Sequence, residues 1–192
     1  MSGLRERKKA KTKLAIQAHA VRLFREQGYA ATTVDQIAEA AEVSPSTVFR
    51  YFASKEELVT TDEFDPVIFA AFEEQPRELS LVRAWRGAMH AVFDRMTDTE
   101  MATEMERMRL VMSVPDLWAG SLDNITNMLT TMSELSARRV GREADDPAVR
   151  GAIGAIFGVL LITALEWGGK PETDLLAMVD TALEQLEAGQ SL

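Results

Sequence analysis

Apolar residues recur at helical spacing along almost the whole chain, whereas the sustained alternation typical of strands is nearly absent. Near the N-terminus, Ile16, Leu23 and Phe24 fall at positions i, i+7 and i+8, which places them on one face of a helix. Gly28 follows this stretch and favours the turn that ends a helix. The pattern predicts a first helix from about residue 7 to residue 27, and an all-α fold.

Capping signals divide the next thirty residues into short helices. Thr33, with Gln36 three residues later, has the spacing of a capping box and predicts the start of a second helix. Ser44 directly before Pro45 predicts the start of a third helix, because proline is well tolerated in a first turn. Ser54 opens a Ser-x-x-Glu box that predicts a fourth helix, reaching to about residue 62.

The remaining residues predict six further helices, several of which begin at a proline, whose fixed φ suits a first turn. Their expected ranges are 66–74, 80–96, 99–112, 115–139, 147–167 and 171–188.

Two short helices joined by a tight turn describe a helix-turn-helix, a motif that presents its second helix to the major groove of DNA. The N-terminal residues of that second helix must be small or hydrogen-bonding, because they meet the edges of the bases. Ser44 to Thr47 satisfy this requirement, while Val48 and Phe52, at i and i+4, provide an apolar face behind them.

The stretch from residue 16 to residue 58 resembles the tetracycline-repressor (TetR) family of regulators. The residues that carry the resemblance are Phe24, Gly28, Tyr29, Thr32, Thr33, Val34, Ile37, Ala38, Val43, Ser44, Thr47, Phe52, Ser54, Lys55, Glu56, Glu57 and Leu58. The resemblance implies an N-terminal three-helix DNA-binding domain with a helix-turn-helix, residues 1–53. It also implies a helical ligand-binding and dimerisation domain, residues 54–192.

The same resemblance implies which side chains meet DNA. Positions that face base edges in the family correspond to Ser44, Pro45, Ser46 and Arg50, and positions that touch phosphates correspond to Thr33, Thr47, Tyr51 and Lys55. Arginine suits a base-reading role because its guanidinium matches the guanine O6 and N7 acceptors. A contact from Arg50 to the DNA backbone alone is the alternative.

Two positions depart from the family pattern. Phe49 stands where tyrosine is usual, so a common phosphate-binding hydroxyl is missing, and Tyr51 offers a neighbouring one. Glu42 replaces the usual turn glycine, which predicts strain of about 1 kcal/mol in the turn.

Charge is distributed unevenly along the chain. The net charge is −9, yet residues 1–55 hold ten Lys/Arg and five Asp/Glu, whereas residues 56–192 hold eleven and twenty-five. The local field, rather than the total, decides DNA binding. We expect the basic tail, residues 1–13, to fray at its start and to lie against phosphates or enter the minor groove, although a solvated tail is the alternative. Its basic residues are Arg5, Arg7, Lys8, Lys9, Lys11 and Lys13.

The chain beyond the fourth helix is rich in methionine and aromatic residues, which suit a pocket for varied apolar ligands. Ordinary core packing is the alternative for each of them. The candidate ligand-binding residues are Trp85, Met89, Phe93, Met105, Met108, Trp118, Met128 and Phe157. Polar side chains that could orient a ligand include His90, Glu104 and Arg107.

The helix expected at 147–167 is apolar nearly all round and contains Gly151, Gly154 and Gly158. Because glycine in a helix interior lowers stability, close approach of another backbone is the expected compensation. With the helix at 171–188, it would form a four-helix bundle between two copies of the chain, as the family typically does. A core within one chain is the alternative.

The absence of cysteine and of a signal segment predicts a cytoplasmic protein, and the longest apolar run, residues 152–165, falls short of a membrane span. No nucleophile–base arrangement, metal-ligand spacing or phosphate loop is present, so the sequence predicts neither an enzyme nor a metal or cofactor site. We expect a homodimeric repressor released from a palindromic operator on double-stranded DNA by a small hydrophobic or amphipathic effector. Activation instead of repression, an enzyme, or a ligand-free helical module are the alternatives.

Overall fold

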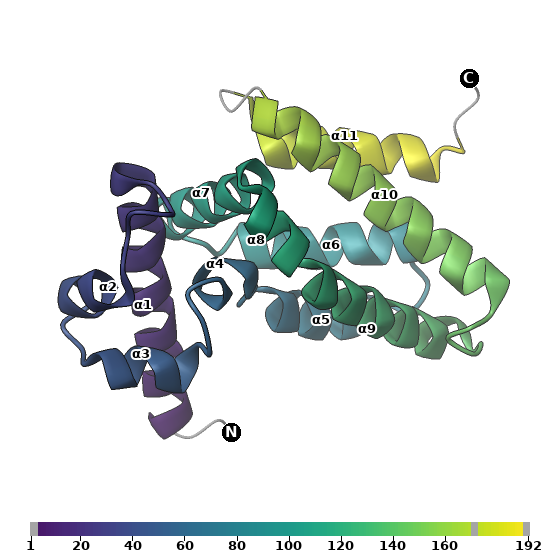
Figure 1. Ribbon diagram of the computed structural model, residues 1–192. Helices are drawn as coiled ribbons and strands as arrows, with labels where there is room; N and C mark the ends of the chain where they lie inside the picture. Colours follow the sequence, from purple (N-terminus) through teal and green to yellow (C-terminus); the bar gives the residue numbers. More distant parts are fainter. Residues whose placement is uncertain (1–3, 170–172, 190–192) are drawn as a thin grey trace. The chain divides into compact units, whose positions relative to one another are not determined.

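A computed structural model describes residues 4–169 and 173–189 of the chain, and side chains from residue 8 onward. These residues form α-helices and contain no strand, which confirms the expected fold class (Figure 1). The helices are α1 Leu4–Gln27, α2 Val34–Ala40, α3 Pro45–Tyr51, α4 Glu57–Thr60, α5 Asp65–Glu74, α6 Leu81–Phe93, α7 Asp98–Ser113, α8 Pro115–Gly120, α9 Leu122–Val140, α10 Pro147–Gly169 and α11 Leu175–Glu187.

Helix ends differ from the expected ones at three places. Helix α1 begins at Leu4, so the basic tail is helical from that residue onward, and the expected fraying at residues 1–3 falls outside the described residues. The helix expected at 115–139 is broken at Ser121, whose hydroxyl donates to the Trp118 carbonyl oxygen and competes with the helical ladder. Helix α11 begins at Leu175 instead of residue 171, with Asp174 as its N-cap. The proline expected to open that helix, Pro171, lies outside the described residues.

The chain packs as two compact units. The first takes in the residues up to Glu63 together with Thr97–Leu122, and the second takes in Phe64–Met96 together with the residues from Asp123 onward. The helix-turn-helix lies wholly within the first unit. That unit extends beyond residue 53, because α4, α7 and α8 pack with α1 and with one another.

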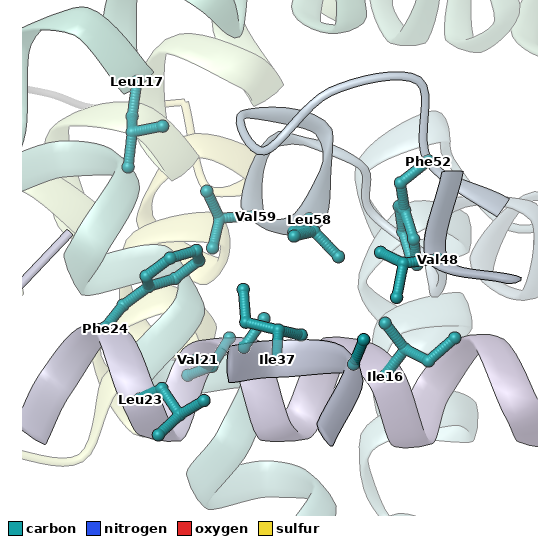
Figure 2. Close-up of a cluster of buried hydrophobic side chains, with 12 residues drawn as sticks. Ile16, Val21, Leu23, Phe24, Ile37, Val48, Phe52, Leu58, Val59 and Leu117 are labelled. Carbon is teal, nitrogen blue, oxygen red and sulfur yellow. The ribbon is translucent and has the colours of Figure 1, made fainter. Parts of the chain in front are cut away.

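The core of the first unit is an apolar cluster built on one face of α1 (Figure 2). Ile16 and Phe24 of α1 are at most 1% exposed, as predicted for its apolar face, and Ile37 of α2 is fully buried. Val48 and Phe52, in and directly after α3, are both 1% exposed. Burying a large apolar side chain contributes about 1.5–3 kcal/mol, so α3 is held firmly by its apolar face.

The capping residues act as the sequence predicts for α2 and α3. The Thr33 hydroxyl accepts from the Gln36 backbone N–H at 3.2 Å, and the Gln36 side chain accepts from the Thr33 N–H at 2.8 Å. Ser44 caps α3 by accepting from the Thr47 N–H at 3.2 Å, with Pro45 in the first turn.

The cap of α4 is displaced from the expected one. The Ser54 hydroxyl accepts from the Glu57 N–H at 3.3 Å, but the Glu57 carboxylate accepts from the N–H of Ala53 rather than from that of Ser54. The helix therefore begins at Glu57 and ends at Thr60, shorter than expected.

The turn between α2 and α3 is strained at Glu42. Its φ is +55°, in the left-handed region that glycine adopts freely. Glu42 donates its N–H to the Glu39 carbonyl oxygen, and Val43 donates to that of Ala38, which closes a Schellman motif. The hydrogen bonds therefore hold a residue with a Cβ atom where a glycine fits best.

In the second unit, α6 packs against α5, α10 and α11, and α10 packs along α11. Trp85 of α6 is 2% exposed and stacks on Phe72 of α5, with ring centroids 4.0 Å apart. Its indole N–H donates to the Ser136 hydroxyl of α9 at 3.0 Å. The polar edge of this large aromatic side chain is thus satisfied inside the core.

Helix α10 is longer than the apolar run in the sequence suggests. Over its 23 residues, Pro147–Gly169, an 18-residue window has a mean hydropathy of 2.0, so by length and composition alone the helix could cross a membrane. The core helix of a soluble protein meets the same criterion. Only 28% of that window is buried within the single chain.

We expect Glu42→Gly to be more stable than Glu42→Ala by about 0.5–1 kcal/mol. Both variants lose the carboxylate, but alanine keeps the left-handed strain that glycine removes, and the entropy of glycine in the unfolded chain offsets part of the gain. Urea denaturation of the two variants measures the difference directly. Equal free energies of unfolding would show that the turn holds no strain.

Candidate DNA-binding surface and effector-binding residues

The N-terminus of α3 presents a cluster of hydroxyl groups. Ser44 Oγ lies 2.9 Å from both Ser46 Oγ and Thr47 Oγ1. Ser44, Pro45 and Ser46 are exposed, and Thr47 is half-buried. Hydroxyls and free backbone N–H groups at a helix N-terminus are suited to the edges of bases and to phosphate oxygens.

Arg50 projects from the exposed side of α3, one turn beyond these hydroxyls. Its guanidinium carbon lies 5.3 Å from the centre of the Tyr51 ring, a cation–π distance that limits the directions in which the side chain reaches. Phe49 is 53% exposed. An aromatic side chain left in water on this surface is available for apolar contact with a nucleic acid, such as a thymine methyl group.

The two outlying candidates on this surface have partners within the protein. Thr33 is exposed and serves as the cap of α2. The Lys55 ammonium lies 4.2 Å from the centre of the Tyr29 ring. The Tyr29 hydroxyl donates to Glu56 at 2.8 Å, and burial followed by this bond raises the pKa of Tyr29. Lys55 is therefore oriented by an aromatic ring before it meets DNA.

The basic tail is only partly available for phosphates. Lys8, Lys9 and Lys11 are exposed along α1. Lys13 is instead bound within the first unit, because its ammonium lies 2.5 Å from a Glu63 carboxylate oxygen and over the Phe52 ring. Lys13 therefore has partners within the unit, and its contact with phosphates stays a prediction. The side chains of Arg5 and Arg7 lie outside the described residues.

The eight candidate ligand-binding residues are divided between the two units. Met105, Met108 and Trp118 belong to the first unit, and Trp85, Met89, Phe93, Met128 and Phe157 belong to the second. Trp85 is a packed core residue. Met89 and Phe93, one and two turns further along α6, line a cavity of about 240 Å³ against α11.

Two of the polar residues expected to orient a ligand, Glu104 and Arg107, are instead hydrogen-bonded within the first unit. Arg107 donates to Glu104 at 2.8 Å, to Asp62 at 2.7 Å and to the Val59 carbonyl oxygen of α4 at 2.7 Å. Burial raises the pKa of the Glu104 carboxyl group, against the neighbouring Arg107, which lowers it. This network ties α7 to the C-terminal end of α4.

A second hollow, of about 470 Å³, lies between α1 and the start of α7. Its lining includes Arg22, Arg25, Asp98 and Glu106, and none of the candidate ligand residues. His19 also lines it, and its buried Nδ1 has no hydrogen-bond partner.

Opposite charges join α6 to α11 in what we term the α6–α11 ladder. It consists of Arg83, Arg86 and His90 on α6 and Asp180, Glu184 and Glu187 on α11. Arg86 donates to both carboxylate oxygens of Asp180, to Oδ2 at 2.6 Å, and also to Glu184 at 2.6 Å. Arg83 lies 2.7 Å from Glu187, and His90 Nε2 lies 2.7 Å from Asp180 Oδ1.

Comparison with known proteins identifies both parts of the chain. The family model described as "Bacterial regulatory proteins, tetR family" matches residues 16–60, and the one described as "MftR C-terminal domain" matches residues 79–191. The regulator TcmR of Streptomyces glaucescens is 38% identical over 195 residues, covering 96% of this chain and 86% of TcmR. The chain belongs to the TetR family of transcriptional regulators.

Solved structures of TetR-family proteins share the fold at lower identity. The fatty acid degradation regulator FadR of Bacillus halodurans is 22% identical, with a TM-score of 0.65 over 94% of this chain and 96% of that one. FadR of Thermus thermophilus, described as a repressor in complex with lauroyl-CoA, is 21% identical, with a TM-score of 0.55 over 94% and 95%.

The α6–α11 ladder of this TetR-family regulator is the feature that sequence reasoning missed. Its signal was present, because Arg83, Arg86 and His90 stand at i, i+3 and i+7, and Asp180, Glu184 and Glu187 stand at i, i+4 and i+7. Arg83 and Arg86 form a basic stripe on α6 that the His90 imidazole extends, and the three carboxylates form an acidic stripe on α11. Nothing in the sequence pairs two stripes ninety residues apart.

We expect the ladder to weaken in acid. The Arg86 bonds, followed by that of His90, lower the pKa of Asp180 from 3.8 to about 2. A lowered pKa in the folded state stabilises the protein above the unfolded value, and that contribution is lost as the pH falls from about 4 to about 2. Asp180→Asn should lose about 1 kcal/mol at pH 7, since solvent screens a partly exposed pair.

Urea denaturation at several pH values measures this loss, with Asp123→Asn on α9 as the control. The difference in free energy of unfolding between the wild type and Asp180→Asn should shrink below pH 4. A difference that is constant from pH 7 to pH 2 would contradict a role for the Asp180 charge.

Proposed function

We propose that this regulator is a homodimeric repressor that binds a palindromic operator through α3 and releases it when a small hydrophobic or amphipathic molecule binds. The observation that carries the proposal is the two-sided character of α3. Val48 and Phe52 are buried, whereas Ser44, Ser46 and Arg50 are turned to the outside of the first unit. Such a helix is braced from behind and leaves its polar side free for the major groove.

The distribution of charge supports a defined direction of approach. Ten of the twenty-one basic residues lie within residues 1–55, the part of the chain that contains α3, while residues 56–192 carry an excess of fourteen acidic residues. DNA is attracted to the first and repelled by the second. We assign base contacts to Ser44, Pro45, Ser46 and Arg50, and phosphate contacts to Thr33, Thr47, Tyr51 and Lys55.

Dimerisation through α10 and α11 is supported by an apolar stripe on α10 that is exposed to solvent in the single chain. Gly154, Gly158, Ile162 and Leu165 follow one another at i, i+4, i+8 and i+11 on α10. Ile162 is 68% exposed and Leu165 is 51% exposed. A Cβ atom added at Gly151, Gly154 or Gly158 would meet nothing within 4 Å, so no other backbone among the described residues approaches these glycines. We infer that a second copy supplies the approach.

The proposed effector class is supported by the residues that line the cavity between α6 and α11 and by the family membership. FadR of Thermus thermophilus binds lauroyl-CoA, an amphipathic molecule. Met89 and Phe93 of this chain line a cavity of mixed apolar and polar character. A ligand releases the operator only if it prefers the arrangement of the dimer that fits DNA less well. The family membership supports a regulator rather than an enzyme, and we expect the protein in the cytoplasm.

Arg50→Ala should lower operator affinity by about 10- to 100-fold and weaken discrimination against other sequences, because a base-reading arginine is removed. Fluorescence anisotropy with the palindrome upstream of the protein's own gene and with a scrambled duplex measures both quantities. Arg25→Ala, on the side of α1 that lines the hollow with α7, removes the same charge and serves as the control. Equal losses on both duplexes for Arg50→Ala would assign it to the DNA backbone instead.

Ile162→Glu should convert the dimer to a monomer, with a dimer dissociation constant raised at least about 100-fold, because it buries an unpaired charge in the proposed interface. Sedimentation velocity measures the change. Val67→Glu on α5, at a position that is 50% exposed, is the matched control and should stay dimeric. A dimer that survives Ile162→Glu would move the interface away from α10.

Gly154→Ala distinguishes a glycine in open space from one under a neighbouring helix. In an isolated helix the change would raise stability by about 1 kcal/mol. Beneath a closely packed partner helix it should instead weaken the dimer, as read in the same sedimentation experiment.

A further inference from the structure

The cavity between α6 and α11 has apolar walls and an acidic edge. Six apolar side chains form the walls: Met89, Phe93, Leu176, Ala177, Val179 and Leu183. Five polar side chains complete the lining: Arg86, His90, Asp94, Asp174 and Asp180. Its volume of about 240 Å³ lies just below the roughly 300–1,000 Å³ of pockets for drug-sized ligands, so it suits a smaller molecule.

The one arginine in the lining is already neutralised. Arg86 donates to both oxygens of Asp180 and to Glu184, so its N–H groups are directed at carboxylates of α11. Asp180 also bonds with His90, at 2.7 Å. An anionic ligand would have to break these bonds before it could use the guanidinium.

Two further carboxylates of the lining, those of Asp94 and Asp174, are not bonded to Arg86. Asp94 has a side chain that is 74% exposed, and it stands 4.0 Å from His90 Nδ1, beyond hydrogen-bond distance. Asp174 accepts from the Ala177 backbone N–H at 3.1 Å as the N-cap of α11, a partner without a full charge. With three carboxylates against one guanidinium, the lining is negative overall.

A metal ion is not the occupant that this geometry favours. Throughout residues 4–169 and 173–189, no three His, Asp or Glu side chains stand close enough together to hold a metal. The apolar walls would also provide no hydrogen-bonding or ligand atoms for a hydrated cation. An organic molecule with an apolar body and a positive head matches both parts of the lining, and the Phe93 ring adds a cation–π partner.

We propose that the α6–α11 cavity binds a small amphipathic cation, such as an aromatic amine, as the effector of this regulator. The proposal rests on the proposed function and names its ligand class. The aromatic body lies among Met89, Phe93 and Leu176, and the ammonium group lies near Asp94. The second unit holds sixteen Asp/Glu and nine Lys/Arg, and this acidic balance attracts a cation.

The position of the cavity links the ligand to the proposed dimer. Its second wall is α11, which packs along α10. A ligand held between α6 and α11 therefore presses on one of the two helices assigned to the interface. The ladder holds these helices in register in the free protein, so the ligand acts on a defined starting arrangement.

Three probes with one aromatic body and different heads test the ligand class on the full-length protein. They are 2-(1-naphthyl)ethylamine, the neutral 2-(1-naphthyl)ethanol and the anionic 1-naphthylacetate. By isothermal titration calorimetry without DNA, we expect the amine to bind at least about tenfold more tightly than the alcohol, and the acetate more weakly still. Equal affinities for amine and alcohol would overturn the proposal.

Matched variants test the site. Asp94→Asn should weaken amine binding about fivefold and leave alcohol binding unchanged, since it removes charge and little volume. Glu134→Gln, an exposed position on α9, removes an acidic charge from the same unit and should change neither. An affinity for the amine that is the same in Asp94→Asn as in the wild type would also overturn the proposal.

Operator anisotropy separates this proposal from the proposed function. The amine, but not the acetate, should lower operator affinity in the wild type, and Asp94→Asn should require about fivefold more amine. Amine binding that leaves operator affinity unchanged would overturn the effector role. A ligand-free protein that fails to distinguish the palindrome from a scrambled duplex would overturn the proposed function, whatever the calorimetry shows.

Discussion

The burial of one side of α3 is the constraint on which the DNA-binding surface depends. Val48 and Phe52 lie against the apolar face of α1 in the core of the first unit, and a helix of only seven residues has no freedom to rotate once both are buried. The period of 3.6 residues then turns Ser46 and Arg50 outward. The Glu42 turn and the Thr33 cap support this placement, and the strain at Glu42 is outweighed by the packing that surrounds it.

In the second unit, apolar packing and charged contacts position different helices. Trp85 and Phe72 fix α6 against α5 by stacking, and the α6–α11 ladder aligns α11 along another face of α6. Apolar contact is non-directional, whereas an arginine that bonds both oxygens of a carboxylate sets orientation and register. The ladder thus gives a defined geometry to a cavity whose walls are otherwise flexible methionine and leucine side chains. The stripe on α10 that this packing leaves exposed is the one assigned to a second copy.

Local signals predicted the starts of the short helices α2 and α3 well and the ends of the later helices less well. Thr33, Ser44 and Pro45 act through neighbours three residues away, so their roles could be read from the sequence. The sequence did not predict the break at Ser121, because apolar periodicity continues through that position. Nor did it predict the late start of α11, which is set by the Asp174 cap. The candidate ligand residues follow from composition, helical spacing and the family resemblance. Composition does not distinguish Trp85, which is packed in the core, from Met89, which lines a cavity.

The sequence by itself determined the all-helical class, the helix-turn-helix with its polar outer side, and the contrast between a basic start and an acidic body. Each depends on spacing within a few residues or on a simple sum of charges. The tertiary structure decided which partners distant residues take: Lys13 with Glu63, Arg107 with the end of α4, and Arg86 with Asp180. Such pairs join residues about fifty to ninety positions apart, and their meeting depends on how whole helices pack, which no local pattern encodes.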